Sequence, residues 1–368
     1  MARGDNRAVS DESPETLPAD PGAGLTANAS ASEFRCLECA GRMEFDAAQR
    51  LMVCAYCSAT RPVGTVEKEQ TIVEYDLEHG LAAASARGFG VAVRTIACKQ
   101  CGAVVSFGDS ATARDCDFCG SSQVLEQTES RNHLRPESVV PFQTDRAAAT
   151  AKFGHWVGKL WFRPSDLKRL AKVSEMTGMY VPYWAFDADV HSDWTADAGH
   201  YYYVTETRTS KDADGKTVTR QEQVRKVRWT PAWGARDDHY DDLLICGSRG
   251  MPVAMTHKLE PFDTKHLRPY DPSFLAGWRA EEYSVELNDA WKTAVTRIEQ
   301  SQKQKCSGDV PGDTQRFLDV TNRFAAEKFK HVLLPIWISA YRYQGKPFQF
   351  LVNGQTGEVT GTAPWSVV

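Results

Sequence analysis

The stretch Cys36-Leu-Glu-Cys39, followed after 14 residues by Cys54-Ala-Tyr-Cys57, decides how the first part of this chain folds. The same pattern returns as Cys98-Lys-Gln-Cys101 and, again after 14 residues, Cys116-Asp-Phe-Cys119. Each gap is one residue short of the usual zinc window. A Cys-x2-Cys turn presents two thiolates to one ion, and two such turns joined by a hairpin complete a closed, structural tetrahedral site. We therefore predict two zinc ribbons that hold two structural Zn²⁺ ions.

The two ribbons differ at the residue after each second knuckle cysteine. The second ribbon has Gly102 and Gly120 there, and glycine readily adopts the left-handed conformation that turns backbone N–H groups towards the sulfurs. The first ribbon has Ala40 and Ser58, so its turns are either strained or shifted by one residue. We predict that the first site is the weaker one and releases its metal first.

Disulfides and redox chemistry are the competing interpretations of these cysteines. Disulfides need an oxidising compartment, and the start of the chain shows no secretory leader. A redox Cys-x2-Cys motif should lie beside a βαβ pattern, whereas these pairs are joined by short polar hairpins. Cys246 and Cys306 stand alone and are expected to be small buried or idle thiols.

The length of 368 residues and the hydrophobic content of 42% fit a globular protein of two or three domains. Met1 to Ser32 has no apolar stretch and should be a disordered tail. The longest apolar run, around Val332 to Ile338, is far shorter than the roughly 20 residues of a membrane span. We expect a soluble, cytoplasmic protein without a transmembrane span, and peripheral membrane association stays open.

The formal charge of −5 becomes about −9 once each four-thiolate zinc site is counted as −2. Nucleic-acid binders usually present a basic face. Around the knuckles, basic residues are matched by acidic ones: Arg35, Arg42, Arg50 and Lys99 against Glu38, Glu44, Asp46, Asp115 and Asp117. The charge therefore does not support nucleic acid as a partner, although it leaves it open.

The predicted fold class is α+β: two small four-cysteine zinc ribbons followed by a mixed α+β body with antiparallel sheets. The expected segments are a tail at 1–32, ribbon 1 at 33–63, a helical connector at 64–95, ribbon 2 at 96–125, a first half with a long hairpin at 136–240 and a second half at 241–368. An internal duplication is suggested because Val140–Thr144 resembles Glu260–Thr264, and Val181–Trp184 resembles Leu334–Trp337, in the same order.

Periodicity predicts helices over Ala147–Leu160, Glu281–Gln304 and Phe317–Phe329. Gly178–Asp187 should be a buried central strand, because few of its positions are polar. Two polar, strand-like runs on either side of Asp214-Gly215 predict a hairpin, which is either an arm that contacts a partner or a solvated edge.

No stretch meets the requirements of a catalytic motif. The run Gly154–Leu160 fails as a phosphate loop in spacing and in its bulky residues. The cluster Asp237–Asp242 could bind a cation, but acidic runs are usually solvated. The loose group His191, Asp193 and His200 has no known catalytic geometry. We predict no catalytic residues.

Several stretches resemble the bacterial double zinc-ribbon proteins. The resemblance covers about Phe34 to Trp365 and rests on the paired ribbons and on Pro141-Phe142, Trp161–Pro164, Gly178–Asp187 and Leu334–Gly357. Members are often labelled primosomal protein N′ (replication factor Y), superfamily II helicase-like or transcription-factor-IIB-type zinc-ribbon proteins. The resemblance implies zinc at the eight cysteines. The resemblance does not imply ATPase activity, because this sequence lacks the phosphate-binding and Asp-Glu motifs of the helicase. Some relatives continue past the final strand into membrane helices, and some are found beside genes for phage-shock-type or stomatin-like membrane proteins.

The sequence favours a zinc-binding, non-enzymatic scaffold or adaptor that contacts a protein partner, in a membrane-stress-related assembly. One alternative is a DNA-binding replication-restart accessory protein that uses its ribbons. Another is a hydrolase built on the His and Asp residues of 189–242.

Overall fold

The computed structural model describes residues 34–46, 49–63, 72–80, 87–89, 94–107, 115–127, 133–159, 176–211, 213, 215–343 and 346–362. The predicted tail at 1–32 and most of the predicted helical connector lie outside these residues. The strands are β1 Met43–Asp46, β2 Leu51–Cys54, β3 Thr60–Pro62, β4 Tyr75–Asp76, β5 Arg94–Cys98, β6 Val104–Phe107, β7 Val124–Gln127, β8 Ser138–Val139, β9 Thr177–Lys211, β10 Thr217–Cys246, β11 Arg268–Pro269, β12 Arg279–Glu282, β13 Thr314–Tyr343, β14 Lys346–Asn353 and β15 Val359–Gly361. The α-helices are α2 Arg146–Gly158, α4 Val253–Leu259 and α5 Leu287–Asp309, and short 3-10 helices cover Thr264–His266 and Pro272–Leu275.

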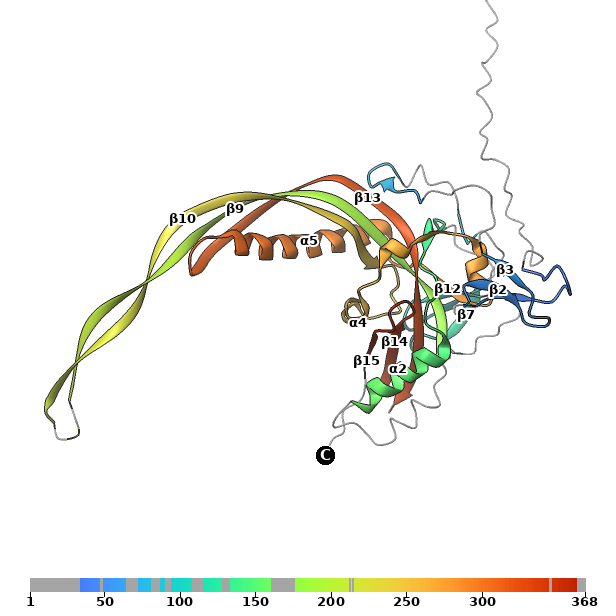
Figure 1. Ribbon diagram of the computed structural model, residues 1–368, viewed down its shortest axis with the longest axis horizontal. Helices are drawn as coiled ribbons and strands as arrows, with labels where there is room; N and C mark the ends of the chain where they lie inside the picture. The colour runs from blue at the N-terminus through green and yellow to red at the C-terminus, as the bar shows by residue number, and fades with distance from the viewer. Residues whose placement is uncertain are drawn as a thin grey trace, which may run out of the picture.

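Two sheets organise the described residues, which confirms the predicted α+β class with mainly antiparallel strands. The first ribbon has its own sheet, β1-β2-β3. The larger sheet runs β11-β8-β13-β9-β12-β6-β5-β7, with β10 added to β9 and β14 and β15 added beside β13. The strands of the second ribbon are therefore part of the sheet of the body (Figure 1). In the described residues, no helix is both long and apolar enough to span a bilayer.

Strand β9 is the central strand that the sequence predicts. Strand β13 pairs antiparallel with residues Thr177 to Gly199 of β9 and so occupies one edge of β9. On the opposite edge of β9, β12 pairs first and in parallel, and β10 pairs further along the strand. Residues 178 to 188 of β9 are all buried, because both faces of the sheet are covered there. Val181 and Leu334, from the two similar Pro-aromatic motifs, face each other in this pairing, while the internal duplication itself stays a prediction.

The helix predicted over Phe317–Phe329 is wrong, because these residues form part of β13. Two bulges explain the error: the register with β9 shifts between Arg316 and Asp319 and again between Ala325 and Lys328. Phe317 and Ala326 have positive φ at these points, 55° and 51°. Each bulge moves the alternation of side chains by one position. The strand therefore lacks a continuous period of two and imitates a helical pattern.

Helix α5 covers the long strands with a narrow apolar stripe (Figure 1). Its buried residues recur every three or four positions: Leu287, Ala290, Ala294, Ile298, Gln302 and Cys306. They pack in successive layers on alternate β9 residues: Phe186 near Ala290, Val190 near Ile298, and Trp194 near Cys306. Four helical residues rise about 6.0 Å and two strand residues about 6.6 Å, so the layers stay in register. The predicted helix exists, but it begins later than Glu281, which belongs to β12.

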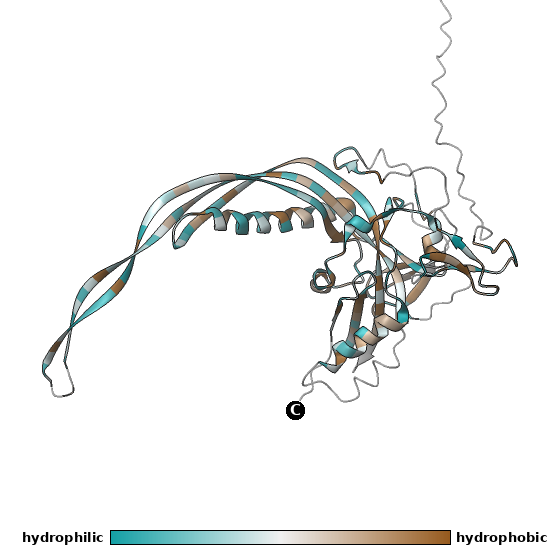
Figure 2. Cartoon of the chain, in the orientation of Figure 1, coloured by the Kyte–Doolittle hydropathy of each residue, from teal (hydrophilic) through white to brown (hydrophobic). Residues whose placement is uncertain are grey.

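Strands β9 and β10 form a hairpin that is much longer than predicted. They pair from Tyr183–Cys246 to Lys211–Thr217, with one irregularity between Tyr240 and Leu243. Strand β13 begins at Thr314, opposite Gly199, and α5 ends at Asp309. Beyond this point the two strands project from the body as an arm, with polar and apolar residues mixed along it (Figures 1 and 2). We call residues 200–211 and 217–228 the distal ribbon.

Replacing Gly178 by Ala should destabilise the protein. A Cβ there would lie closer than 3.0 Å to two ring carbons of Trp278 and 3.0 Å from Trp337. Such overpacking typically costs about 1–3 kcal/mol, to be measured by urea unfolding. Gly154→Ala in α2 is the control, because nothing lies within 4 Å of its Cβ position and alanine favours a helix by up to about 1 kcal/mol. Equal stability of the two variants would contradict the packing argument.

Candidate metal centre

The structure brings each predicted set of four cysteines together. In the first ribbon, Cys36 Sγ lies 3.5 Å from Cys57 Sγ, and Cys39 Sγ lies 3.5 Å from Cys54 Sγ. In the second ribbon the corresponding distances are 3.6 Å for Cys98–Cys119 and 3.6 Å for Cys101–Cys116. Within each set, all four sulfurs lie within 4.8 Å of one another, and none is in a disulfide.

These distances fit a zinc–thiolate tetrahedron. A Zn–S bond of about 2.3 Å places neighbouring sulfurs about 3.8 Å apart, whereas a disulfide would require about 2.05 Å. Four sulfurs complete the coordination shell, so each set provides a closed, structural type of site. The donor sets therefore support zinc binding at Cys36, Cys39, Cys54, Cys57, Cys98, Cys101, Cys116 and Cys119.

The four knuckles share one backbone pattern. The residue after the second cysteine donates its N–H to the first cysteine's carbonyl, as in Ala40 to Cys36 at 2.9 Å and Gly102 to Cys98 at 3.0 Å. The first cysteine in turn donates to the carbonyl one position further on, as in Cys36 to Gly41 at 2.8 Å. The first ribbon therefore uses the same turn as the second, without a shift.

The first ribbon forms this turn with strained residues. Ala40 has φ 55° and Ser58 has φ 59°, while the equivalent glycines have φ 78° at Gly102 and 62° at Gly120. A residue with a Cβ in the left-handed region costs about 1–2 kcal/mol, which glycine avoids. Of the two explanations that the sequence left open, strain is therefore the correct one.

Backbone N–H groups also prepare the knuckles for thiolates. The N–H groups of Cys57 and Tyr56 lower the pKa of the Cys54 thiol to about 6. Tyr56 N lies 3.5 Å from Cys54 Sγ, and Gly41 N lies 3.4 Å from Cys39 Sγ. Such hydrogen bonds favour the charged sulfur that a metal ion requires.

Both ribbons are packed onto the body rather than free. In the first, Phe45 makes an edge-on contact with Phe274, with ring centroids 5.4 Å apart, and its carbonyl accepts from Trp278 Nε1 at 2.9 Å. In the second, Phe118 is fully buried and its carbonyl accepts from the Gln349 side chain. Asp117 of the same knuckle is ion-paired with Arg279 of β12. Phe45 and Phe118 of the ribbons therefore contribute to the core of the body.

The acidic cluster Asp237–Asp242 is occupied by protein partners. Asp187, Asp241 and Asp242 come together, but Lys330 Nζ lies 2.6 Å from Asp242 Oδ1 and 2.8 Å from Glu74 Oε1. The buried lysine ammonium supplies the positive charge that a bound cation would supply. Asp242 and Asp187 therefore belong to a structural network around Lys330.

The loose group of His191, Asp193 and His200 is not one site. His191 contacts Asp237 at 2.6 Å and Asp193 at 3.4 Å on an exposed part of the sheet. His200 lies nine residues further along β9, roughly 30 Å away at 3.3 Å per residue. The Gly154–Lys159 run lies in α2 and its C-terminal cap, which agrees with its rejection as a phosphate loop.

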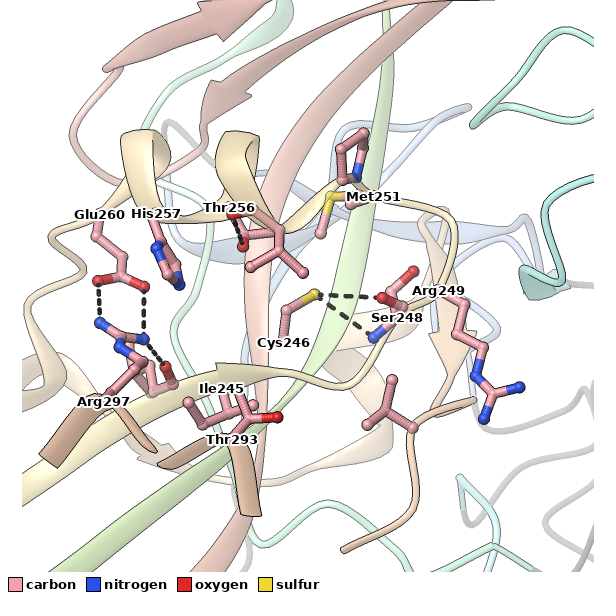
Figure 3. Close-up of a pocket in the computed structure, with 14 residues that line it drawn as sticks. Ile245, Cys246, Ser248, Arg249, Met251, Thr256, His257, Glu260, Thr293 and Arg297 are labelled. Atoms are coloured by element: carbon pink, nitrogen blue, oxygen red, sulfur yellow. Dashed lines mark hydrogen bonds and ion pairs between the residues drawn. The ribbon is translucent and has the colours of Figure 1, made fainter. Parts of the chain in front are cut away.

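A pocket that no sequence pattern indicates lies at the base of the arm, between the end of β10, α4 and α5 (Figure 3). Cys246 lines it, and burial raises the pKa of this thiol to about 12, so the group is a poor nucleophile. Ser248 also lines it, and donates to Glu281 Oε1 at 2.6 Å. Glu281 Oε2 has no hydrogen-bond partner among the described residues. The lining residues come from separate segments, so no spacing in the sequence marks them.

The knuckle glycines provide a test of the strain. Replacing both Ala40 and Ser58 by Gly should strengthen the first site by about 1 kcal/mol, roughly fivefold in zinc affinity, since relief of strain exceeds the added chain entropy. Gly102→Ala should weaken the second site by a similar amount. Zinc release to a colorimetric chelator should show two phases, of which the fast one belongs to the wild-type first ribbon. If the double substitution in the first ribbon changed the slow phase and not the fast one, the first site would not be the one that releases zinc first.

The buried Glu281 predicts a pH-dependent stability. Burial raises its pKa to about 8, above the ordinary value of 4.5, so the folded protein binds a proton that the unfolded chain releases. The free energy of unfolding should therefore fall as pH rises from 6.5 to 8, by up to about 1.4 kcal/mol per unit. Glu281→Gln stays neutral and should lose this slope in urea unfolding. If the free energies of unfolding of the wild type and Glu281→Gln differed by the same amount at every pH from 6.5 to 8, Glu281 would not be the group that titrates.

Comparison with known proteins finds a similar chain in Bacillus subtilis. No family model matches the sequence, and no solved structure matches it. The chain is 27% identical over 239 residues to "Uncharacterized protein YdjG" of Bacillus subtilis (strain 168), which covers 64% of this chain. The chain spans 65% of that relative's length, slightly less than two thirds.

Proposed function

We propose that this protein is a non-enzymatic, zinc-binding scaffold or adaptor whose β-arm contacts a protein partner. The single observation that supports this most strongly is the distal ribbon. Its two strands pair with each other beyond Tyr201, while in the described residues the pairing of β13 with β9 ends at Gly199. An isolated two-stranded ribbon is only marginally stable in water, so its length requires a reason outside the body.

The surface of the distal ribbon suits protein contact. Tyr203 is 63% exposed, and Arg225 lies over the Tyr201 ring at 4.3 Å. Near the base, Trp233 and Phe317 are each 77% exposed. Aromatic and arginine side chains contribute most to binding energy at protein interfaces. Their concentration on a projecting element favours the adaptor over a solvated edge hairpin.

The charge of the arm indicates an acidic partner surface. Residues 200–228 contain seven Lys or Arg and four Asp or Glu, in a chain whose formal charge is −5. Opposite charges steer association and weaken with salt. The membrane-stress-related assembly is suggested by the resemblance to double zinc-ribbon proteins, some of which occur beside phage-shock-type membrane proteins.

The same charge gives the second candidate function its support. A replication-restart accessory protein would bind DNA through phosphate contacts. The arm carries the positive excess for this, whereas the knuckles of the ribbons have five acidic neighbours against four basic ones. DNA binding, if present, would therefore depend on the arm.

A shortened arm tests the proposal. The variant joins Val204 to Val224, which pair with each other, by an Asn-Gly turn in place of residues 205–223. It should fold with an unchanged Tm but lose the partner that the full-length protein recovers from its native cell, as identified by mass spectrometry. The control joins Ser210 to Val218 in the same way, which removes only the tip, and should keep the partner.

Two outcomes would reject the adaptor. One is an identical set of partners for the shortened and full-length proteins. The other is binding of forked DNA in fluorescence anisotropy that weakens with salt and disappears with the shortened arm, which would favour the DNA-binding candidate.

A further inference from the structure

The pocket at the base of the arm has the size of a small-ligand site. Its volume is about 310 Å³, at the lower end of the range of such sites. At the roughly 30 Å³ that one water molecule occupies in the liquid, it holds about ten non-hydrogen atoms. Its walls come from β10, the following loop, α4 and α5, so the site is built by packing of the body (Figure 3).

Most of the wall is apolar. The aliphatic side chains and the thioether that line it are Leu244, Ile245, Met251, Val253 and Val285. Val253 is 63% exposed, which leaves an apolar surface that a ligand could cover. Burial of such surface contributes about 25 cal/mol per Å². An aliphatic chain is therefore the expected body of the ligand.

The charged groups that line the pocket are mostly cationic. Glu260 is the single carboxylate among the lining residues, and its oxygens accept from Arg297 at 3.1 and 3.4 Å. In the part of the chain that the structure describes, the side chains of Arg249 and His257 have no hydrogen-bond or ion-pair partner. Figure 3 shows His257 beside the Glu260–Arg297 pair and Arg249 at the other side, with Cys246 between them. Because Glu260 is paired with Arg297, the Arg249 guanidinium, unpaired among the described residues, leaves the lining with a positive charge that favours an anionic ligand.

We infer that this pocket binds a small amphipathic anion: an aliphatic chain of about eight carbons that ends in a carboxylate or a phosphate. The chain lies against the apolar wall, and the anionic head is held by Arg249. The proposal concerns reversible binding and assigns no chemical role to Cys246. This inference is independent of the proposed adaptor function.

Calorimetric titration of the full-length, zinc-loaded protein tests both the anionic head and the aliphatic chain of the proposed ligand. Octanoate should bind saturably to one site, and octyl phosphate shows whether a phosphate head serves as well as a carboxylate. Octylamine, of equal length and opposite charge, should bind at least about tenfold more weakly, since a charged hydrogen bond contributes roughly 1.5–3 kcal/mol. Absence of saturable binding by both anions, or equal binding of octylamine, would overturn the inference.

Two matched pairs of variants locate the site. Val253→Glu places a negative charge among the lining residues and should weaken octanoate binding at least about tenfold. Ala254→Glu, on the next exposed and non-lining residue of α4, should leave it unchanged. Arg249→Gln should weaken binding, whereas Lys258→Gln, also exposed and outside the lining, should not. All four changes are at exposed positions, so equal affinities within both pairs would show that the anion binds elsewhere and reject the site.

Discussion

The antiparallel pairing of β9 with β13 is the constraint on which the rest of the structure depends. It extends from Thr177 opposite Ile338 to Gly199 opposite Thr314. Because β13 takes one edge of β9, the second ribbon must join through β12 on the other edge, and β10 must follow further along. Helix α5 can then cover only one face, where its layers match alternate residues of β9. The second ribbon, β10 and α5 are therefore all arranged around this pairing.

The metal centres could be predicted from the sequence because their chemistry is local. Two Cys-x2-Cys turns at a fixed spacing specify four sulfurs around one ion, and the structure brings both sets together. The strained turns at Ala40 and Ser58 could also be predicted from the sequence, because the cost of a left-handed conformation depends on whether the residue there is glycine. Strand β9 was predictable for a related reason: a strand covered on both faces is apolar throughout.

Features that arise from distant segments could not be predicted. The bulges in β13 are set by pairing with β9, and they hid the strand alternation that would have marked Phe317–Phe329 correctly. The contacts between the ribbons and the body are also invisible in the sequence. The carbonyls of Phe118 and Phe45 accept hydrogen bonds from side chains 231 and 233 positions away, a pairing that no spacing records. The pocket behind Cys246 likewise combines residues 244–260 with residues of α5.

The uninterrupted course of β10 has a mechanical consequence. This strand runs from Thr217 at the far end of the arm to Cys246 in the pocket wall, hydrogen-bonded to β9 along almost its whole length. A paired ribbon resists bending in its hydrogen-bonded plane, and α5 clamps its inner part. A force applied at the free end would therefore reach the pocket wall through one continuous element, past the bulge at Tyr240–Leu243.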